Sequence, residues 1–454
     1  MKPRLHAASC RSTVTRLVIA LGVVGGALTP AAPAGAQSAL QACNGDHHAT
    51  PDLAVEGCTM LIRSGKFSGR NLAVAYTNRG SAYDDLHDED RAIADQNEAI
   101  RIDPKLDLAF NNRANAYGRK GEIDRALADY DEAIRLNPKF VRAINNRGTT
   151  YRDDKHDSDR AIADYDAAIR LSPKFADAYN NRGIAYAAKR DHARAIADYT
   201  SAIRLDAKFA LAYNNRGLQY GDQGNDAAAI ADFDRAVEID PRYANAYRNR
   251  GSAYVRTGAY DRAISDLTTA HLLDAKDTST LIGRATAFER TGDLDRAIAD
   301  YDSALALEPQ DRTALTDRGF AHFSRGDFAE AAADLSRAME KDAYTYAALF
   351  RFLAQSRAGM APSDLEPAVR RMTNQGWPYP VFELYRGQRD VEATLGAAQK
   401  PEERCEAHYY VAEWHLLQGD RAAAKAHFEE AAGTCPKGFV EYVGAQAELR
   451  RLGQ

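Results

Sequence analysis

The fold is decided by residues 179–186, which read YNNRGIAY, because close copies of this stretch recur along the chain. The arginine marks each copy, and the equivalent arginines are Arg79, Arg113, Arg147, Arg182, Arg216, Arg250, Arg284 and Arg318. Their spacings are 34, 34, 35, 34, 34, 34 and 34 residues, with the single extra residue near 153–159. A fixed period of roughly 20–50 residues is typical of solenoids, in which each repeat is one supersecondary unit.

Each repeat is expected to hold two helices. Tyr179, Gly183 and Tyr186 are four and three residues apart, so they share one face of a first helix, helix A. Ala195 and Tyr199 have the same spacing in a second helix, helix B, after a polar turn. In five repeats a proline ends the unit, and proline stops a helix; these prolines are Pro104, Pro138, Pro173, Pro241 and Pro309.

Small residues mark where the two helices meet. Glycine follows the arginine in six of the eight copies, at Gly80, Gly148, Gly183, Gly217, Gly251 and Gly319. Glycine inside a helix costs about 0.5–1 kcal/mol relative to alanine. Its recurrence predicts a close approach of helix A to helix B.

The repeats resemble tetratricopeptide repeats (TPR), with Gly or Ala, Tyr, Ala, an aromatic residue, Ala and Pro in register over 34 residues. Eight copies cover residues 73–343, and a ninth is expected at 405–436, followed by a capping helix within 405–454. Residues 344–404 are expected to form a degenerate helical segment and linker that includes Trp377–Pro380. The resemblance implies an all-α, right-handed TPR solenoid of antiparallel helix pairs, with the A helices on its concave face.

The first 36 residues have the three parts of a secretory signal. Lys2, Arg4, Arg11 and Arg16 precede a short apolar run, residues 17–28, and an Ala-Gly-Ala end at 34–36. The run is too short for a span, which needs about 20 apolar residues. Cleavage after Ala36 removes four basic and no acidic residues, so the net charge of −5 becomes −9. We expect an exported protein, periplasmic or secreted, with no stable membrane insertion afterwards. Lipidation at Cys43 is left open.

Charge and motifs limit the function. Lys and Arg number 59 against 64 Asp and Glu, so a nucleic-acid partner is not expected. No phosphate loop, nucleophile elbow or zinc-protease motif occurs. We therefore expect no enzyme and no cofactor. An enzyme with a site in 344–404, using Glu366, Arg370 and Glu383, is the less favoured alternative.

The marker arginine stands where TPR units have an apolar residue, and helix B offers a matching acid. The aspartates follow the helix-B alanine by three residues in every copy: Asp95, Asp129, Asp164, Asp198, Asp232, Asp266, Asp300 and Asp334. We predict eight partly buried Arg–Asp structural ion pairs between helix A and helix B. The alternative is a charged ligand groove.

An asparagine precedes the arginine in six copies, at Asn78, Asn112, Asn146, Asn181, Asn215 and Asn249. An amide donates to a C=O and accepts from an N–H at once, so it suits a peptide backbone. The TPR region of O-GlcNAc transferase uses asparagine at this position, and the resemblance implies peptide binding here. The alternative is that each asparagine bonds only within its own repeat.

Four cysteines remain after cleavage, and four cysteines allow three pairings. We favour Cys43–Cys58, in an N-terminal cap at 37–72, and Cys405–Cys435. Cys405 begins helix A and Cys435 ends helix B of the last repeat, and these ends should be adjacent because the two helices are antiparallel. Each disulfide would hold a terminal unit, where a solenoid lacks a neighbour. His47 and His48 beside Cys43 match no zinc spacing, so no metal is expected.

These observations favour an envelope scaffold that holds a segment of another protein in its concave groove. A self-assembling structural protein and a glycan-binding protein remain alternatives. The sequence identifies neither the partner nor the oligomeric state.

Overall fold

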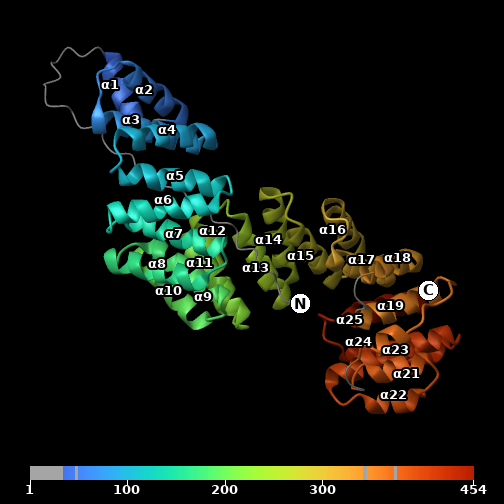
Figure 1. Ribbon diagram of the computed structural model, residues 1–454. Coiled ribbons are helices and arrows are strands. Elements are labelled where there is room, and N and C mark those ends of the chain that lie inside the picture. The colour runs from blue at the N-terminus through green and yellow to red at the C-terminus, as the bar shows by residue number, and fades with distance from the viewer. Residues whose placement is uncertain (1–33, 46–49, 341–344, 373–375, 454) are drawn as a thin grey trace. The chain divides into compact units, whose positions relative to one another are not determined.

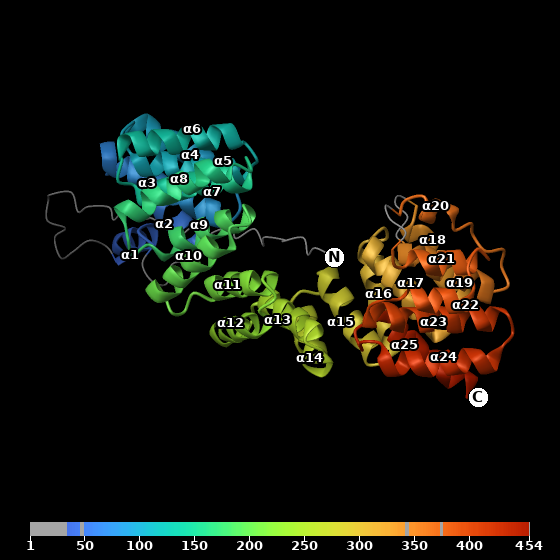
Figure 2. The same cartoon turned by 90° about the horizontal axis from the view of Figure 1, so that it is seen from below.

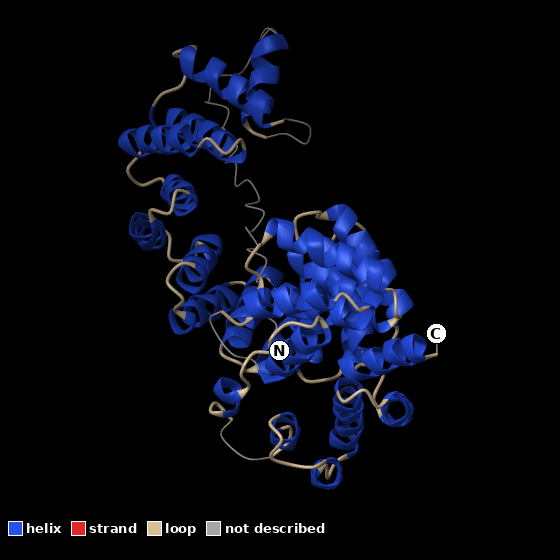
Figure 3. Cartoon of the chain, turned by 90° about the vertical axis from the view of Figure 1, so that its right-hand side faces the viewer, coloured by secondary structure: helices blue, strands red, loops and turns tan. Residues whose placement is uncertain are grey.

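The computed structural model describes residues 34–45, 50–340, 345–372 and 376–453, and all regular elements within these ranges are helices joined by short loops (Figure 3). Residues 1–33 of the expected signal lie outside the described residues. The expected cleavage point after Ala36 falls in the first turn of α1 (Ala34–Cys43). None of the described helices is both long and apolar enough to cross a bilayer.

The chain divides into two compact units, residues 1–219 and 220–454, with the boundary inside α11 (Ala210–Asp222). Unit 1 begins with α1 and α2 (Pro51–Arg63). Four helix pairs follow in chain order (Figure 1). They are α3 (Gly69–Asp85) with α4 (Glu89–Ile102), α5 (Asp107–Arg119) with α6 (Ile123–Leu136), α7 (Val141–Asp153) with α8 (Ser158–Leu171), and α9 (Ala176–Ala188) with α10 (His192–Leu205).

Unit 2 continues the alternation of helices A and B. Its helices are α12 (Asp226–Ile239), α13 (Ala244–Arg256) with α14 (Tyr260–Leu273), α15 (Thr278–Arg290) with α16 (Leu294–Leu307), and α17 (Arg312–Arg325) with α18 (Phe328–Ala338). Repeating antiparallel pairs confirm the predicted all-α solenoid fold class.

Recurring end signals define the helices of each pair. The side chains of Asp157, Asp191 and Asp293 cap the start of a helix B by accepting from a backbone N–H. The residue just before the N-cap position of helix B has a left-handed backbone; it is a glycine in most pairs, such as Gly121 with a φ of 77°, and His87, His156 or Arg190 in the others. Between α7 and α8 this turn is one residue longer than in neighbouring pairs, so the extra residue of the 35-residue spacing lies there.

Close helix packing explains most of the repeated glycines. A Cβ added at Gly183 would lie 2.7 Å from the ring of Tyr199, and one added at Gly251 would lie 2.7 Å from Leu267. Both neighbours are buried. Gly283 in α15 is not one of these glycines, since it precedes the arginine of its repeat, and its added Cβ would lie at an ordinary 3.5 Å from Leu267.

The C-terminal part departs from the regular stack. Its helices are α19 (Thr345–Arg357), α20 (Glu366–Val369), α21 (Tyr379–Tyr385), α22 (Val391–Ala397), α23 (Pro401–Leu417), α24 (Arg421–Thr434) and α25 (Val440–Leu452). Residues of α17–α21 and α23–α25 share one apolar core, and α25 contacts α17 as well as α23 and α24 (Figure 2).

This arrangement refines the expected boundaries. The ninth helix pair is α23 with α24, and it starts at Pro401, four residues before the expected start. Within the expected linker, Tyr379 and Pro380 already belong to α21, because proline is tolerated in a first helical turn, where its missing N–H is not needed.

Candidate functional site

The structure brings seven of the eight expected Arg–Asp pairs together. In each pair the arginine donates from Nε and Nη2 to both carboxylate oxygens, at 2.6–2.9 Å. The aspartates are only 5–8% exposed. Arg216 and Asp232 lie on opposite sides of the unit boundary, so their pairing stays a prediction.

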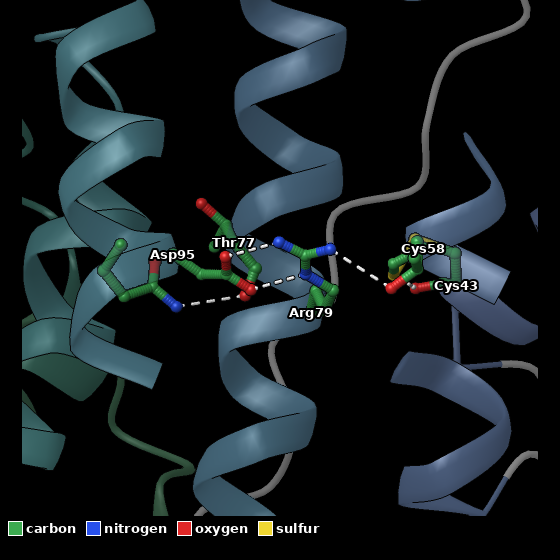
Figure 4. The surroundings of a disulfide bond; sticks show 7 residues. Cys43, Cys58, Thr77, Arg79 and Asp95 are labelled. Carbon is green, nitrogen blue, oxygen red and sulfur yellow. Dashed lines mark hydrogen bonds and ion pairs between the residues drawn. A yellow bond between two sulfur atoms is a disulfide. The ribbon is translucent and has the colours of Figure 1, made fainter. Parts of the chain in front are cut away.

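Each arginine also reaches the helix that precedes its own helix A. Nη1 donates at 2.5–3.3 Å to a polar side chain there. Arg79 contacts Thr59 of α2 in this way, and its guanidinium lies between Asp95 and the helix that carries Cys58 (Figure 4). The other acceptors are Asn97, Asp131, Asp166, Thr200, Asp234, Thr268 and Asp302. Each of the seven arginines with an observed aspartate partner therefore joins three helices.

Sequence reasoning missed this third contact, although its signal is present. The acceptors of α4 to α16 lie two residues after the paired aspartate, where the chain always has Asp, Asn or Thr. Had the pattern been noted, it would have indicated contacts between repeats as well as within them.

Aromatic rings flank the same guanidinium groups. The Arg182 guanidinium lies 5.7 Å from the ring centre of Tyr179 and 5.9 Å from that of Tyr186. The hydrogen bond with Asp198 raises the pKa of Arg182 in spite of burial, so the guanidinium stays ionised. A ligand carboxylate would have to displace partners that are already bidentate, so this geometry favours the structural interpretation over a charged ligand groove.

The asparagines form hydrogen bonds between repeats. Asn181 Nδ2 donates to Asn145 Oδ1, and Asn215 Nδ2 donates to Asn180 Oδ1, each at 3.1 Å. Asn146 Nδ2 makes longer contacts of 3.4 Å with amide oxygens of α5. In each case the acceptor belongs to the preceding repeat, so bonding confined to one repeat does not describe these side chains.

Burial separates the six asparagines. Asn78 is 3% exposed and Asn112 is 8% exposed. Asn146, Asn181 and Asn215, on α7, α9 and α11, are half-buried. We call the surface around these three side chains the amide face. Asn249, also half-buried, lies in unit 2.

The amide face keeps hydrogen-bonding capacity. Among the described residues, no donor is bonded to the Oδ1 atoms of Asn146 and Asn215, and Asn181 Oδ1 has only a 3.5 Å contact from Arg152. Because one N–H of each side chain is tied to the preceding repeat, the amide orientation is set before any ligand arrives. The arrangement can accept hydrogen bonds from a row of N–H donors.

Both expected disulfides are formed, Cys43–Cys58 between α1 and α2 and Cys405–Cys435 between α23 and the end of α24. They close loops with sequence separations of 15 and 30 residues. Both link helices at the ends of the array.

The residues of the alternative catalytic site do not converge. Glu366 pairs with Arg370 at 3.1 Å and with Arg386 at 2.6 Å, whereas Glu383 pairs with Arg389 at 2.7 Å. Across the parts of the chain that the structure describes, no three His, Cys, Asp or Glu side chains form a group suited to a metal ion.

Buried carboxylates in the C-terminal core were not predicted. Glu406 accepts hydrogen bonds from Trp377 Nε1 at 2.7 Å and from Tyr346 Oη at 2.8 Å. Glu441 accepts from Tyr410 Oη at 2.9 Å, and burial raises the pKa of Glu441 to about 7. Glu406 and Glu441 lie where the repeat pattern is weak, so alignment with the other repeats did not indicate that they are buried.

Comparison with protein-family models gives matches to tetratricopeptide repeats along residues 73–359. The model described as "TPR repeat" matches residues 157–189 and 217–258. Models described as "Tetratricopeptide repeat" match residues 73–106, 108–140, 176–209 and 284–359. No curated protein matches the chain.

Solved structures with similar folds include other repeat proteins. A tetratricopeptide repeat protein from Parabacteroides merdae is 19% identical, covers 53% of this chain and 95% of its own, and has a TM-score of 0.43. MamA is 28% identical, with coverages of 36% and 95% and a TM-score of 0.33. YrrB, titled "a TPR protein with an unusual peptide-binding site", is 21% identical, with coverages of 41% and 95% and a TM-score of 0.35.

Proposed function

The chain belongs to the tetratricopeptide repeat family, and from this membership we propose that it is an exported scaffold whose amide face holds an extended segment of a partner protein. TPR repeats support protein interaction as the general function. The exported location and the extended ligand are the specific parts of the proposal.

One observation carries the choice of ligand. Asn181 and Asn215 are fixed by their Nδ2 atoms to the preceding repeat, and their half-buried side chains present Oδ1 atoms one repeat apart. An extended backbone supplies N–H donors at regular intervals whatever its side chains are, so a row of oriented amide acceptors suits it.

Export rests on two independent features. The first 36 residues have the pattern of a cleaved signal. Both disulfides lie between terminal helices, and disulfides persist mainly in oxidising compartments outside the cytoplasm. Expression with a fused reporter, followed by N-terminal sequencing of the exported product, tests this part. An uncleaved chain that remains in the cytoplasm would contradict it.

The ligand part is tested by capture from an extract of the envelope of the producing cell. The chain offers a matched control, because Asn181→Ala with Asn215→Ala and Asn145→Ala with Asn180→Ala remove the same two hydrogen bonds between repeats. Only the first variant also removes the Oδ1 atoms of Asn181 and Asn215. We expect the first variant to lose the partner and the second to keep it. Equal capture by both variants would place binding elsewhere.

A further inference from the structure

The last helix pair has lost the Arg–Asp arrangement of the other repeats, and histidines occupy its positions. Aligning Ala424 with the helix-B alanine Ala195 places His408 and His415 where Tyr179 and Tyr186 flank the arginine. In the same alignment Val411 replaces Arg182, and His427 replaces Asp198. Three imidazoles thus take the place of two aromatic rings and an aspartate.

The structure brings these three side chains together. His408 Nδ1 and His427 Nδ1 share a hydrogen bond of 3.0 Å across the interface between α23 and α24, with the donor set by the tautomer of each ring. The ring of His415 stacks on that of His427, with centroids 5.6 Å apart and an interplanar angle of 12°. All three are half-buried.

We propose that His408 and His427 bind a divalent transition-metal ion between their Nδ1 atoms. Two ligand bonds of about 2.0–2.1 Å that meet at about 90–109° place their nitrogen atoms about 2.9–3.4 Å apart. The observed separation of 3.0 Å lies within this range. Imidazole nitrogen is a good ligand for Zn²⁺, Cu²⁺ and Ni²⁺.

The surroundings favour the metal-binding form of the imidazoles. Burial lowers the pKa of both His408 and His427, so both rings are neutral at neutral pH. Glu430, one turn after His427 on α24, acts electrostatically on both rings and contributes a negative charge near the cation. Asp420 Oδ2 lies 3.8 Å from Nδ1 of His415, the histidine whose ring stacks on that of His427.

The disulfide fixes the two helices that carry the ligands. Cys405 precedes His408 by one turn on α23, and Cys435 ends α24. Because both thiols are oxidised, they are not ligands themselves. His415 stacks on His427 and does not join the two facing nitrogen atoms, so the site has two imidazole ligands and leaves the other coordination positions open to water.

The test uses the full chain, stripped with a chelator, in a His47→Ala, His48→Ala background that removes the other histidine pair. Zn²⁺ titration by calorimetry should show one saturable site. His408→Gln and His427→Gln should each weaken it at least about tenfold, whereas His415→Gln should retain it. Electron paramagnetic resonance of bound Cu²⁺ should show two nitrogen ligands.

Two results would overturn the proposal. One is the absence of saturable Zn²⁺ binding in the background variant. The other is binding that survives both His408→Gln and His427→Gln. Melting curves recorded without metal identify any variant that fails to fold. If a variant does not fold, the proposal is decided instead by the number of nitrogen ligands of Cu²⁺ bound to the His47→Ala, His48→Ala protein.

Discussion

The bidentate Arg–Asp pairs give the sharpest stability prediction, and Arg182 provides an internal comparison. Its guanidinium binds two carboxylates, Asp198 within the repeat and Asp166 on the preceding helix B. The side chain of Asp198 is 8% exposed, and that of Asp166 is 37% exposed. Asp198→Ala leaves the largely buried guanidinium of Arg182 without its bidentate carboxylate partner. Asp166→Ala removes only one hydrogen bond, which solvent screens.

The two substitutions should differ several-fold in the amount by which they lower the free energy of unfolding. Removing one member of a buried pair costs about 3–5 kcal/mol, and we expect the lower end for Asp198→Ala because Arg182 keeps Asp166. An exposed pair contributes about 0–1 kcal/mol, which sets the expectation for Asp166→Ala. Replacing both Arg182 and Asp198 by apolar residues should cost less than Asp198→Ala alone, because no charge is left stranded.

Urea-induced unfolding followed by circular dichroism measures these differences, and Arg182→Met completes a double-mutant cycle. Hydrogen exchange on α9 and α10 shows whether the loss is local, as expected where repeats contact only neighbours. Equal destabilisation by Asp198→Ala and Asp166→Ala, or a coupling energy near zero between Arg182 and Asp198, would refute the structural role of the pairs.

Three further predictions concern packing, pH and the C-terminal disulfide. Gly251→Ala should destabilise the protein by about 1–3 kcal/mol, because the added methyl group clashes with the buried Leu267. Gly283→Ala should stabilise it by up to about 1 kcal/mol, because the site has room for a methyl group. Thermal melting should therefore show a lower melting temperature for the first variant and an equal or higher one for the second. Burial raises the pKa of Glu441 from 4.5 to about 7, so its stabilising effect is complete below pH 4.5 and is lost as the pH rises to about 7. The free energy of unfolding should fall by about 3 kcal/mol over this pH range because of Glu441. A Glu441→Gln variant whose stability falls as steeply as that of the unchanged protein would contradict this assignment. Reducing Cys405–Cys435 should lower stability by about 3–4 kcal/mol in the chain-entropy model; an unchanged melting temperature in the Cys405→Ser, Cys435→Ser variant would count against this.

The repeated part of the fold follows from the sequence because its signals agree at several levels. The period of 34 residues, the helical spacing of Tyr179, Gly183 and Tyr186, and the prolines all predict the same helix pairs. Eightfold recurrence also made the Arg–Asp pairing visible, since a coincidence would not recur in register. Antiparallel geometry within the last repeat was enough to pair Cys405 with Cys435, which leaves Cys43 and Cys58 for the other disulfide.

The remaining features depend on contacts that a single repeat does not contain. The Nδ2 bonds of Asn181 and Asn215 cross from one repeat to the preceding one, so the register within one repeat could not reveal their acceptors. The contact of α25 with α17 joins segments more than one hundred residues apart in a region without a strict period. The histidines at 408 and 427 are 19 residues apart, and only alignment with the Arg–Asp positions relates them.

The most direct test of the central claim is hydrogen exchange on the complex with the captured partner. Binding at the amide face should slow exchange in α7, α9 and α11 and leave α8 and α10 unchanged, since the half-buried asparagines of that face lie on the first set. That pattern requires no substitution and so does not depend on the stability of a variant. Protection confined to α8 and α10, or to the helices of unit 2, would contradict the account.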